Sequence, residues 1–382
     1  VDCNTYKRCG GCNLRHVKYE ETLKMKQNAV QSLVNKTLKN KLQIKETVGM
    51  ENPLHYRNKA QYPIGINKKG EPVIGVFANR THEVIPIDNC LIQNKKSEEI
   101  AKFIIEFIKE KNISIYDEKK GKGLVRHIVT KVGIKTGEIM CVIVINGHKI
   151  PNENELVENL KTRYPEIKAI VKNINMKNTN VILGQENINL YGNGYIEDIL
   201  GEYKFKISPL SFYQVNPVQA EKLYNLGVSM AEITKNDVVF DLYCGIGTIS
   251  LFMSKFAKKV YGIEIVEEAV KMAKENAQNN NVSNTEFFAG DVEIVLDDLI
   301  NNKGLKADVV MFDPPRKGLD KKSIDNILNI RPKKIVYISC NPATLIRDLA
   351  DFENEYDIKT IIPVDMFPFT SHVECVATLQ LK

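Results

Sequence analysis

Residues 238–248 read VVFDLYCGIGT, an apolar run that ends in two glycines separated by one residue. The apolar run predicts a buried strand, and the glycines predict a tight turn into a helix, where the backbone can approach a ligand closely. A dinucleotide-binding turn would have a third glycine where Ser250 stands. Gly245 and Gly247 are therefore candidate ligand-binding residues at the end of a strand.

Around this stretch, short apolar runs alternate with helical stretches, as in a doubly wound parallel sheet. The last two runs are too close together for a crossover helix, so we expect an antiparallel hairpin at one edge of the sheet. The expected strands are 238–244, 259–265, 285–291, 307–313, 333–339, 360–367 and 372–381. We predict an α/β domain with a seven-stranded, Rossmann-like sheet over residues 207–382.

Acidic residues stand at the ends of the next strands. Glu264 ends the second, where a carboxylate can accept hydrogen bonds from the ribose of an adenosyl group, and Asp291 ends the third, near an adenine edge. Glycines, Glu and Asp in this order favour S-adenosylmethionine over a nicotinamide nucleotide, and thus a class I methyltransferase fold. Asp313 ends the fourth strand in DPPRKG, whose prolines turn the loop over the same pocket. Amino-group methyltransferases place an aromatic residue after these prolines, and Arg316 stands there instead.

A cysteine follows the fifth strand. Cys340 lies in YISCNPATL, between an apolar run and a helix that starts at Pro342. Carbon 5 of uracil is a poor nucleophile, and addition of a thiolate to carbon 6 makes it reactive once the base has left the stack. We expect the helix N-terminus to lower the thiol pKa. Glu374, in HVECV, is the candidate base that removes the carbon 5 proton.

Structural roles are the alternatives for these two residues. Cys340 could be a buried core cysteine, and Glu374 could cap or salt-bridge the start of a terminal strand. The other cysteines of the apolar strands, Cys141, Cys244 and Cys375, are interpreted as packing residues.

Five motifs occur in order: SPLSFYQVNP (208–217), DLYCGIGT (241–248), DPPRKG (313–318), SCNPATLIRDL (339–349) and HVECV (372–376). In them the chain resembles, over nearly its whole length, the RNA uracil-5 methyltransferase family that modifies 23S rRNA and tRNA. The resemblance implies Cys340 as nucleophile and Glu374 as base, and Phe212 as a residue that stacks on the flipped uracil or its neighbours, the alternative being a core aromatic. Arg316 is a candidate substrate contact. The implied contacts to S-adenosylmethionine are Gln214, Tyr243, Glu264, Asp291 and Asp313.

Four cysteines mark the N-terminal part: Cys3, Cys9 and Cys12, then a distant Cys90. By the same resemblance this spacing implies a structural 4Fe-4S cluster, with redox sensing left open. Four thiolates could equally hold a structural zinc, and disulfides are not expected in the cytoplasm. Some members of the family carry a TRAM domain ahead of these cysteines, and because Val1 is not an initiator methionine we allow for residues upstream.

The N-terminal half is expected to bind RNA. Residues 1–150 carry 27 basic and 15 acidic side chains, and residues 151–382 carry 26 and 32. Positive charge of this size can bind a polyanion, although a lysine-rich solvated surface is the alternative. We predict an iron-sulfur and mixed α/β RNA-binding domain over residues 1–206, with strands near 72–79, 124–133, 137–146 and 168–175 and a helix near 98–110. A helix over about 19–38 is expected to pack on the catalytic domain.

No stretch approaches the roughly 20 apolar residues of a membrane span, so we expect a cytoplasmic protein. We also expect it to be a monomer. The favoured function is methylation of carbon 5 of a uridine in 23S rRNA, and the same reaction in the tRNA T-loop is the alternative. A cytosine-5 methyltransferase is less expected. Two other classes stay open: a noncatalytic RNA-binding ribosome-assembly factor and a redox iron-sulfur protein.

Overall fold

The computed structural model describes residues 2–78 and 81–382, and these divide into two compact units. Unit 1 comprises residues 2–16, 52–200 and 205–217. Unit 2 comprises residues 17–51, 201–204 and 218–382. We placed a single boundary after residue 206, whereas the chain passes between the two units five times.

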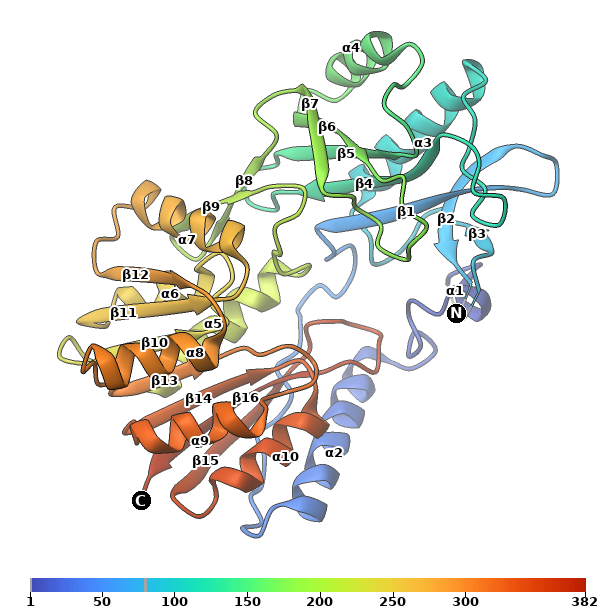
Figure 1. Ribbon diagram of the computed structural model, residues 1–382. Coiled ribbons are helices and arrows are strands. Elements are labelled where there is room, and N and C mark those ends of the chain that lie inside the picture. Colours follow the sequence, from blue (N-terminus) through green and yellow to red (C-terminus); the bar gives the residue numbers. More distant parts are fainter. Residues whose placement is uncertain (1, 79–80) are drawn as a thin grey trace. The chain divides into compact units, whose positions relative to one another are not determined.

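Unit 1 contains a mixed seven-stranded sheet in the order β3-β2-β1-β4-β5-β6-β7 (Figure 1). Neighbouring strands are antiparallel except β5 and β6, which are parallel and flank helix α4 (Glu153–Arg163) in the sequence. The strands are β1 (Lys59–Ile66), β2 (Pro72–Phe77), β3 (Val84–Pro86), β4 (Val125–Val132), β5 (Ile139–Ile145), β6 (Ile167–Ile174) and β7 (Glu186–Tyr191). Strands β8 (Ile196–Leu200) and β9 (Tyr203–Ile207) pair as a separate ribbon.

The core of unit 1 lies between this sheet and helix α3 (Lys95–Glu110), which packs on β1, β2 and β4. Every residue of β4 and β5 is buried, as the continuous apolar run of β5 predicts; β4 also buries the polar side chains of Arg126, His127, Thr130 and Lys131. The four predicted strands and the predicted helix are present. Five strands were missed: β1 contains Pro63 and Gly65, β7 is a polar edge strand, and β3, β8 and β9 are short, with 3, 5 and 5 residues.

Unit 2 contains a seven-stranded sheet in the order β12-β11-β10-β13-β14-β16-β15. The first five strands in this order are parallel, and β16 is antiparallel to both of its neighbours. The strands are β10 (Val238–Leu242), β11 (Lys259–Glu264), β12 (Thr285–Ala289), β13 (Val309–Phe312), β14 (Lys334–Ser339), β15 (Tyr356–Val364) and β16 (Glu374–Leu381). All seven predicted strands and the terminal hairpin are therefore confirmed.

Helices cover both faces of this sheet (Figure 1). They are α2 (Tyr19–Thr37), α5 (Pro217–Ala231), α6 (Thr248–Ser254), α7 (Glu267–Asn279), α8 (Val292–Asp297), α9 (Lys321–Ile330) and α10 (Pro342–Phe352), with a π-helical turn at Asp298–Asn302. Because consecutive parallel strands end at one edge of the sheet, the loops after β10, β11, β13 and β14 meet there. In the described residues no helix has the length and apolar character needed to cross a lipid bilayer. A short helix, α1 (Tyr6–Cys9), belongs to unit 1.

Helix α2 packs on α10 in unit 2, although it comes from the N-terminal part of the sequence. Its buried stripe is Thr22, Lys26, Val30 and Val34, one residue per turn. The ammonium group of Lys26 donates to Asp365 Oδ1 at 2.5 Å, and both side chains are almost fully buried. The hydroxyl of Tyr19 donates to the other oxygen of Asp365 at 2.7 Å. A buried ion pair therefore holds α2 in place.

We expect Lys26→Met to lower the free energy of unfolding by about 3–5 kcal/mol, because it leaves the buried carboxylate of Asp365 without its charged partner. Lys24→Met is the matched control, since the ion pair between Lys24 and Glu21 is exposed and its removal should leave the free energy of unfolding nearly unchanged. Urea unfolding of both variants measures the difference. Equal losses in the two variants would show that the buried pair does not hold the helix.

Candidate active site

The turn between β10 and α6 is built from unusual backbone conformations. Tyr243, Gly245 and Gly247 have φ angles of 66°, 55° and 81°. A Cβ atom on Gly247 would lie 3.1 Å from Ala273 and from Phe287, so close packing requires glycine there. A Cβ atom on Gly245 would meet no atom within 4 Å. The backbone at Gly245 therefore faces open space, as a ligand-binding turn requires.

Glu264, at the end of β11, contacts this turn. Its Oε2 accepts the N–H of Gly245 at 3.1 Å, and its Oε1 accepts the N–H of Val266 at 2.9 Å. Asp291 instead caps helix α8 by accepting the N–H of Glu293 at 2.9 Å. The structure thus joins Glu264 to the glycine turn. The capping bond gives Asp291 a structural role, and its contact to an adenine stays a prediction.

Three carboxyl groups with raised pKa values lie at the same edge of the sheet. Burial raises the pKa of Asp241 to about 7, with the charges of Asp313 and Glu264 adding to the shift. Burial likewise raises the pKa of Asp313 to about 7. For Glu374, burial and the charge of Asp313 raise the pKa to about 8, and the guanidinium of Arg316 opposes the shift. Perturbed carboxyl groups of this kind are typical of catalytic sites.

Cys340 lies beside these groups, between the end of β14 and the start of α10. The pKa of its thiol is raised, mainly by burial and then by the charges of Glu374 and Asp313. The charge of Arg316 opposes this increase. The contribution expected from the helix N-terminus stays a prediction, and in sum burial and the two carboxyl groups outweigh the effects that lower this pKa. Forming the thiolate therefore requires a change in this environment or a nearby base.

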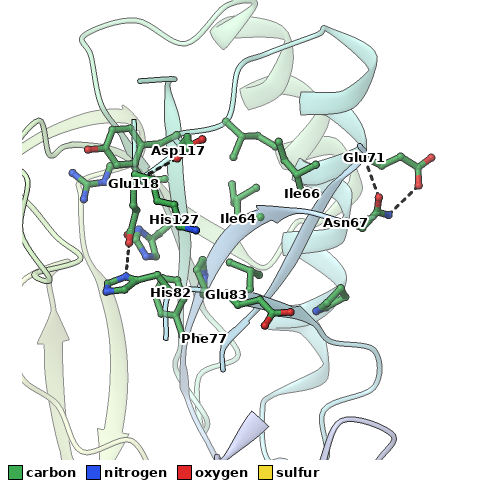
Figure 2. Close-up of a pocket in the computed structure, with 18 of the residues that line it drawn as sticks. Ile64, Ile66, Asn67, Glu71, Phe77, His82, Glu83, Asp117, Glu118 and His127 are labelled. Atoms are coloured by element: carbon green, nitrogen blue, oxygen red, sulfur yellow. Dashed lines mark hydrogen bonds and ion pairs between the residues drawn. The ribbon is translucent and has the colours of Figure 1, made fainter. Parts of the chain in front are cut away.

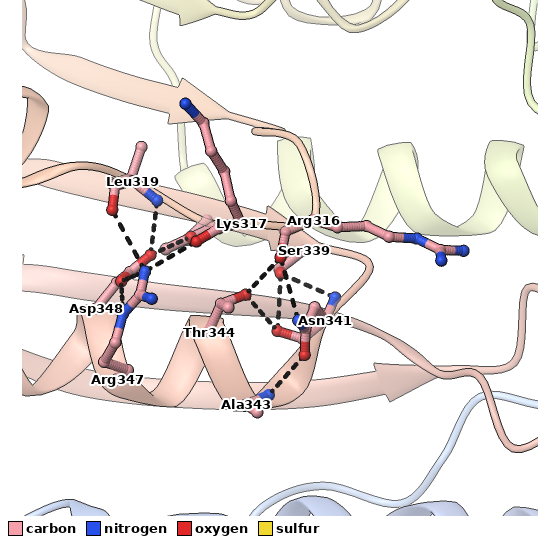
Figure 3. A network of polar contacts seen from close by, with 10 residues as sticks. Arg316, Lys317, Leu319, Ser339, Asn341, Ala343, Thr344, Arg347 and Asp348 are labelled. Carbon is pink, nitrogen blue, oxygen red and sulfur yellow. Dashed lines mark hydrogen bonds and ion pairs between the residues drawn. The ribbon is translucent and has the colours of Figure 1, made fainter.

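The segment that carries Arg316 is fastened to the start of α10 (Figure 3). The carbonyl of Arg316 accepts hydrogen bonds from the Asn341 side-chain amide at 3.1 Å and from the Thr344 hydroxyl at 3.3 Å. The side chain of Asn341 also caps the helix by accepting the N–H of Ala343 at 3.1 Å. Residues that follow Cys340 thus hold the DPPRKG segment at Arg316.

A second set of contacts holds the other end of this segment (Figure 3). Arg347 donates to the carbonyls of Lys317 at 3.0 Å and Leu319 at 3.3 Å. The buried carboxylate of Asp348 accepts the N–H of Leu319 at 2.8 Å and the hydroxyl of Tyr337 at 2.6 Å. Helix α10 and its N-terminal cap therefore hold the second half of the segment, from Arg316 to Leu319.

A cavity of about 360 Å³ opens at Cys340 within unit 2. It is bounded by α2, through Ala29, Val30 and Leu33, and by Arg316 and the residues that follow Cys340. His372 completes the lining, and burial, followed by the charges of Arg316 and Lys26, lowers the pKa of its imidazole. The cavity is in the size range of small-ligand pockets.

Phe212 and Gln214 belong to unit 1, on the segment that follows β9. Phe212 is 71% exposed, which contradicts the core alternative for this aromatic residue. Gln214 is buried, and its carbonyl accepts the side-chain amide of Asn58 at 3.0 Å. An exposed phenyl ring is available for stacking.

The four N-terminal cysteines all belong to unit 1, and their charges affect one another. Burial, followed by the charges of Cys90, Cys9 and Cys3, raises the pKa of Cys12 to about 12. Among the described residues, however, no three Cys, His, Asp or Glu side chains are grouped so that they could hold a metal ion. The structure therefore does not show the predicted metal centre.

We did not single out Asp241 or His372 from the sequence. Asp241 accepts a hydrogen bond from the Ser250 hydroxyl through Oδ2, and its buried Oδ1 has no partner among the described residues. The sequence did contain a sign of Asp241, because an acidic residue inside the apolar run VVFDLYC is expected to be buried and to need a partner. His372 carried no signal, because its place in the cavity depends on α2, which is distant in sequence.

The sheet order of unit 2, with its glycine turn and acidic strand ends, defines a class I S-adenosylmethionine methyltransferase fold. The family model described as tRNA (Uracil-5-)-methyltransferase matches residues 18–382. The chain belongs to this family.

Relatives that match almost the whole of this chain support this assignment. An uncharacterized RNA methyltransferase of Clostridium acetobutylicum is 48% identical over 99% of this chain and 83% of its own length. A Staphylococcus aureus protein of the same description is 45% identical over 100% of this chain and 84% of its own length. Among solved structures, the tRNA (uracil-54, C5)-methyltransferase of Pyrococcus abyssi, in complex with S-adenosyl-L-homocysteine, is 28% identical with a TM-score of 0.79, covering 97% of this chain and 85% of that one.

We expect Gly318→Ala to destabilise unit 2, because a Cβ atom there would lie 2.5 Å from Asp348 Oδ2 and 2.8 Å from Arg347 Nη2. Gly304→Ala is the matched control, since Gly304 also has a positive φ, of 65°, but a Cβ atom there would meet nothing within 4 Å. The overpacked variant should lose about 1–3 kcal/mol more than the control in chemical unfolding. A loss no larger than that of the control would argue against the importance of this network.

Proposed function

We propose that this chain methylates carbon 5 of a specific uridine in 23S rRNA, with S-adenosylmethionine as the methyl donor. The observation that carries the proposal is the grouping of Cys340, Glu374 and Arg316, whose charges affect one another. A thiol and a carboxyl group of raised pKa are the nucleophile and base that substitution at carbon 5 of uracil needs.

In the proposed reaction the Cys340 thiolate forms a bond to carbon 6 of a uracil that has left the RNA stack. Carbon 5 becomes nucleophilic and takes the methyl group from the donor sulfonium, which leaves as the neutral thioether S-adenosylhomocysteine. Glu374 then removes the proton from carbon 5, and the bond between carbon 6 and sulfur breaks to return the thiolate. Arg316 favours the charged forms of both Cys340 and Glu374.

For the methyl donor, we propose binding by the glycine turn and by the acidic strand ends. Gly245 provides the open backbone and Glu264 the ribose contact, supported by the hydrogen bond between them. Tyr243, Asp291 and Asp313 are proposed further contacts, as is Gln214 from unit 1. Phe212 is proposed to stack on the flipped base or on its neighbours.

A tRNA substrate is the second candidate, because the descriptions of the matching family model and of the Pyrococcus abyssi protein both name tRNA. The four N-terminal cysteines favour 23S rRNA as the substrate, because they resemble those of family members that modify 23S rRNA. The test is transfer from labelled S-adenosylmethionine into unmodified 23S rRNA and unmodified tRNA side by side, with mass spectrometry of the product nucleoside. 5-Methyluridine in 23S rRNA supports the proposal, label in tRNA changes the substrate, and no label in either contradicts methyltransferase activity.

We propose that Cys3, Cys9, Cys12 and Cys90 hold a structural 4Fe-4S cluster. The charges of these cysteines affect one another, which supports them as a common set of ligands. Thiolates that surround a cluster are farther apart than the ligands of one ion, so a cluster does not require the close grouping that a single metal ion needs. Protein purified without oxygen should contain iron and sulfide, and Cys12→Ser should lose both. Zinc in place of iron would identify a structural zinc site instead.

Cys340→Ala should bind S-adenosylmethionine normally and transfer no methyl group, because no thiolate can add to carbon 6. Glu374→Gln should accumulate a covalent RNA adduct, with turnover reduced about 10²–10⁴-fold, because elimination needs the base. Denaturing gels with labelled RNA detect the adduct. Cys141→Ala, at a buried cysteine of unit 1, is the control and should stay active. Turnover by Cys340→Ala would remove this thiol from the mechanism.

The pH dependence follows from the pKa of Glu374, which is about 8. The base acts as a carboxylate and the nucleophile as a thiolate, so kcat/KM should rise with pH through about 8 and go on rising until the Cys340 thiol, whose pKa is also raised, has ionised. Arg316→Gln should move this rise to higher pH, because the guanidinium lowers the pKa of both Glu374 and Cys340. A profile measured for both proteins from acid to alkaline pH tests this. An identical profile in the variant would contradict the electrostatic role of Arg316.

A further inference from the structure

Unit 1 contains a second, larger cavity, of about 690 Å³ (Figure 2). It lies within one unit and shares no residue with the cavity at Cys340. Strands β1 and β4 contribute to its wall, together with the loop after β1 and the segment 115–119. Its volume is sufficient for a ligand of nucleotide size.

A β-bulge shapes one wall of this cavity. The pairing of β4 with β5 shifts register between Val125 and His127, so that Arg126 is the extra residue. Successive side chains of a regular strand point to opposite faces, whereas both Arg126 and His127 line the cavity. Bulges commonly redirect side chains beside functional sites. The bulge therefore presents two polar side chains to one space.

His127 is built into the wall without a partner of its own. It is 4% exposed, and neither ring nitrogen has a hydrogen-bond partner among the described residues. Burial, followed by the charge of Arg126, lowers the pKa of His127 to about 4, so the imidazole is neutral at physiological pH. A neutral imidazole offers one N–H donor and one acceptor nitrogen. Such a pair can hydrogen-bond to the edge of a nucleobase.

Arg126 adds a buried positive charge. Its Nη1 donates to the carbonyls of Asn175 at 2.7 Å and Lys177 at 2.8 Å, and its guanidinium lies 4.4 Å from the centre of the Tyr116 ring. Its buried Nε has no partner, and the described part of the chain gives this guanidinium no carboxylate partner. An unneutralised buried cation favours an anionic ligand.

The rest of the lining suits a nucleotide. Phe77 contacts the rings of both His127 and His82, with centroids 6.1 Å and 5.6 Å apart (Figure 2). The four acidic groups of the lining each have a partner: Glu83 with Arg8 at 2.7 Å, Glu118 with His82 at 2.5 Å, Glu71 with Lys109 at 3.3 Å and Asp117 with Lys120 at 3.5 Å. The exposed lysines of the rim, Lys68, Lys69 and Lys119, have no ion-pair partner in the described residues, so their charges are available to phosphates.

We propose that this cavity binds one unstacked nucleotide of the RNA substrate, at a site separate from the catalytic cysteine. The base lies against Phe77 and hydrogen-bonds to His127, and the flanking phosphates contact Lys68, Lys69 and Lys119. Aromatic faces, a neutral donor and acceptor, and nearby cations are the features by which proteins hold unpaired RNA. The inference rests on the proposed RNA substrate and adds a second recognition site to it.

The test uses two variants of the full chain. His127→Phe keeps a ring of similar size and removes both nitrogens, and the Lys68→Ala/Lys69→Ala double variant removes two exposed charges. Lys149→Ala/Lys168→Ala removes two exposed charges of unit 1 outside the cavity and is the matched control. Binding of unmodified 23S rRNA and tRNA transcripts is measured by fluorescence anisotropy at several salt concentrations.

We expect His127→Phe to bind the preferred RNA roughly tenfold more weakly, a typical cost when the protein no longer holds one base. The Lys68→Ala/Lys69→Ala variant should bind more weakly. The slope of log K against log salt concentration should be smaller by about 0.7 for each phosphate that is no longer neutralised, and the control should match the wild type. Both cavity variants should keep their affinity for S-adenosylmethionine and their kcat at saturating RNA, because unit 2 is unchanged.

Folded variants with wild-type RNA affinity would overturn the proposal, as would equal weakening by the control. If His127→Phe does not fold, the lysine variant, whose changes are on the surface, still decides the question. The proposed function is tested separately, because it fails when the wild type transfers no methyl group to RNA. The cavity proposal fails when cavity variants bind RNA as the wild type does.

Discussion

Burial of negative charge at one edge of the unit 2 sheet is the constraint on which the candidate active site depends. Asp313 lies at the centre of this arrangement, because its charge raises the pKa of both Asp241 and Glu374 and acts on Cys340. Arg316 is the cation that opposes the shifts of Glu374 and Cys340. Like charges in a buried site disfavour one another's ionisation, and a bound cation relieves them. Under the proposed function, the sulfonium of the methyl donor would supply such a charge when it binds.

Much of the fold of unit 2 could be predicted, because parallel strands buried on both faces appear as short apolar runs in the sequence. The glycine turn and Glu264 could be placed for the same reason, since they follow such runs. Asp241 was missed although it interrupts one of them. The direction of the Cys340 pKa could not be predicted, because it depends on Glu374 and on burial, which come from parts of the sequence far from YISCNPATL.

In unit 1 the apolar strands were predictable and the features that shape its cavity were not. A β-bulge is a shift in the pairing of two strands and cannot be recognised in one of them, so nothing in LVRHIVTKVG indicated that Arg126 and His127 line one cavity. Charge composition identified the N-terminal half as a candidate RNA-binding region without locating a site. The two cavities divide the candidate RNA contacts between the units. Chemistry is proposed at Cys340 and recognition of a further nucleotide at His127.

The place of helix α2 in unit 2 has a consequence for the synthesis of the protein. Lys26 and Asp365 are 339 residues apart, and the buried stripe of α2 packs on α10, which also comes late in the sequence. During translation the helix leaves the ribosome long before these partners exist, so its apolar face and Lys26 remain in water meanwhile. Contacts between such distant residues slow folding, and domains that need them fold late. Unit 2 can therefore complete its structure only after the C-terminal strands have been made, whereas the sheet of unit 1 is available much earlier.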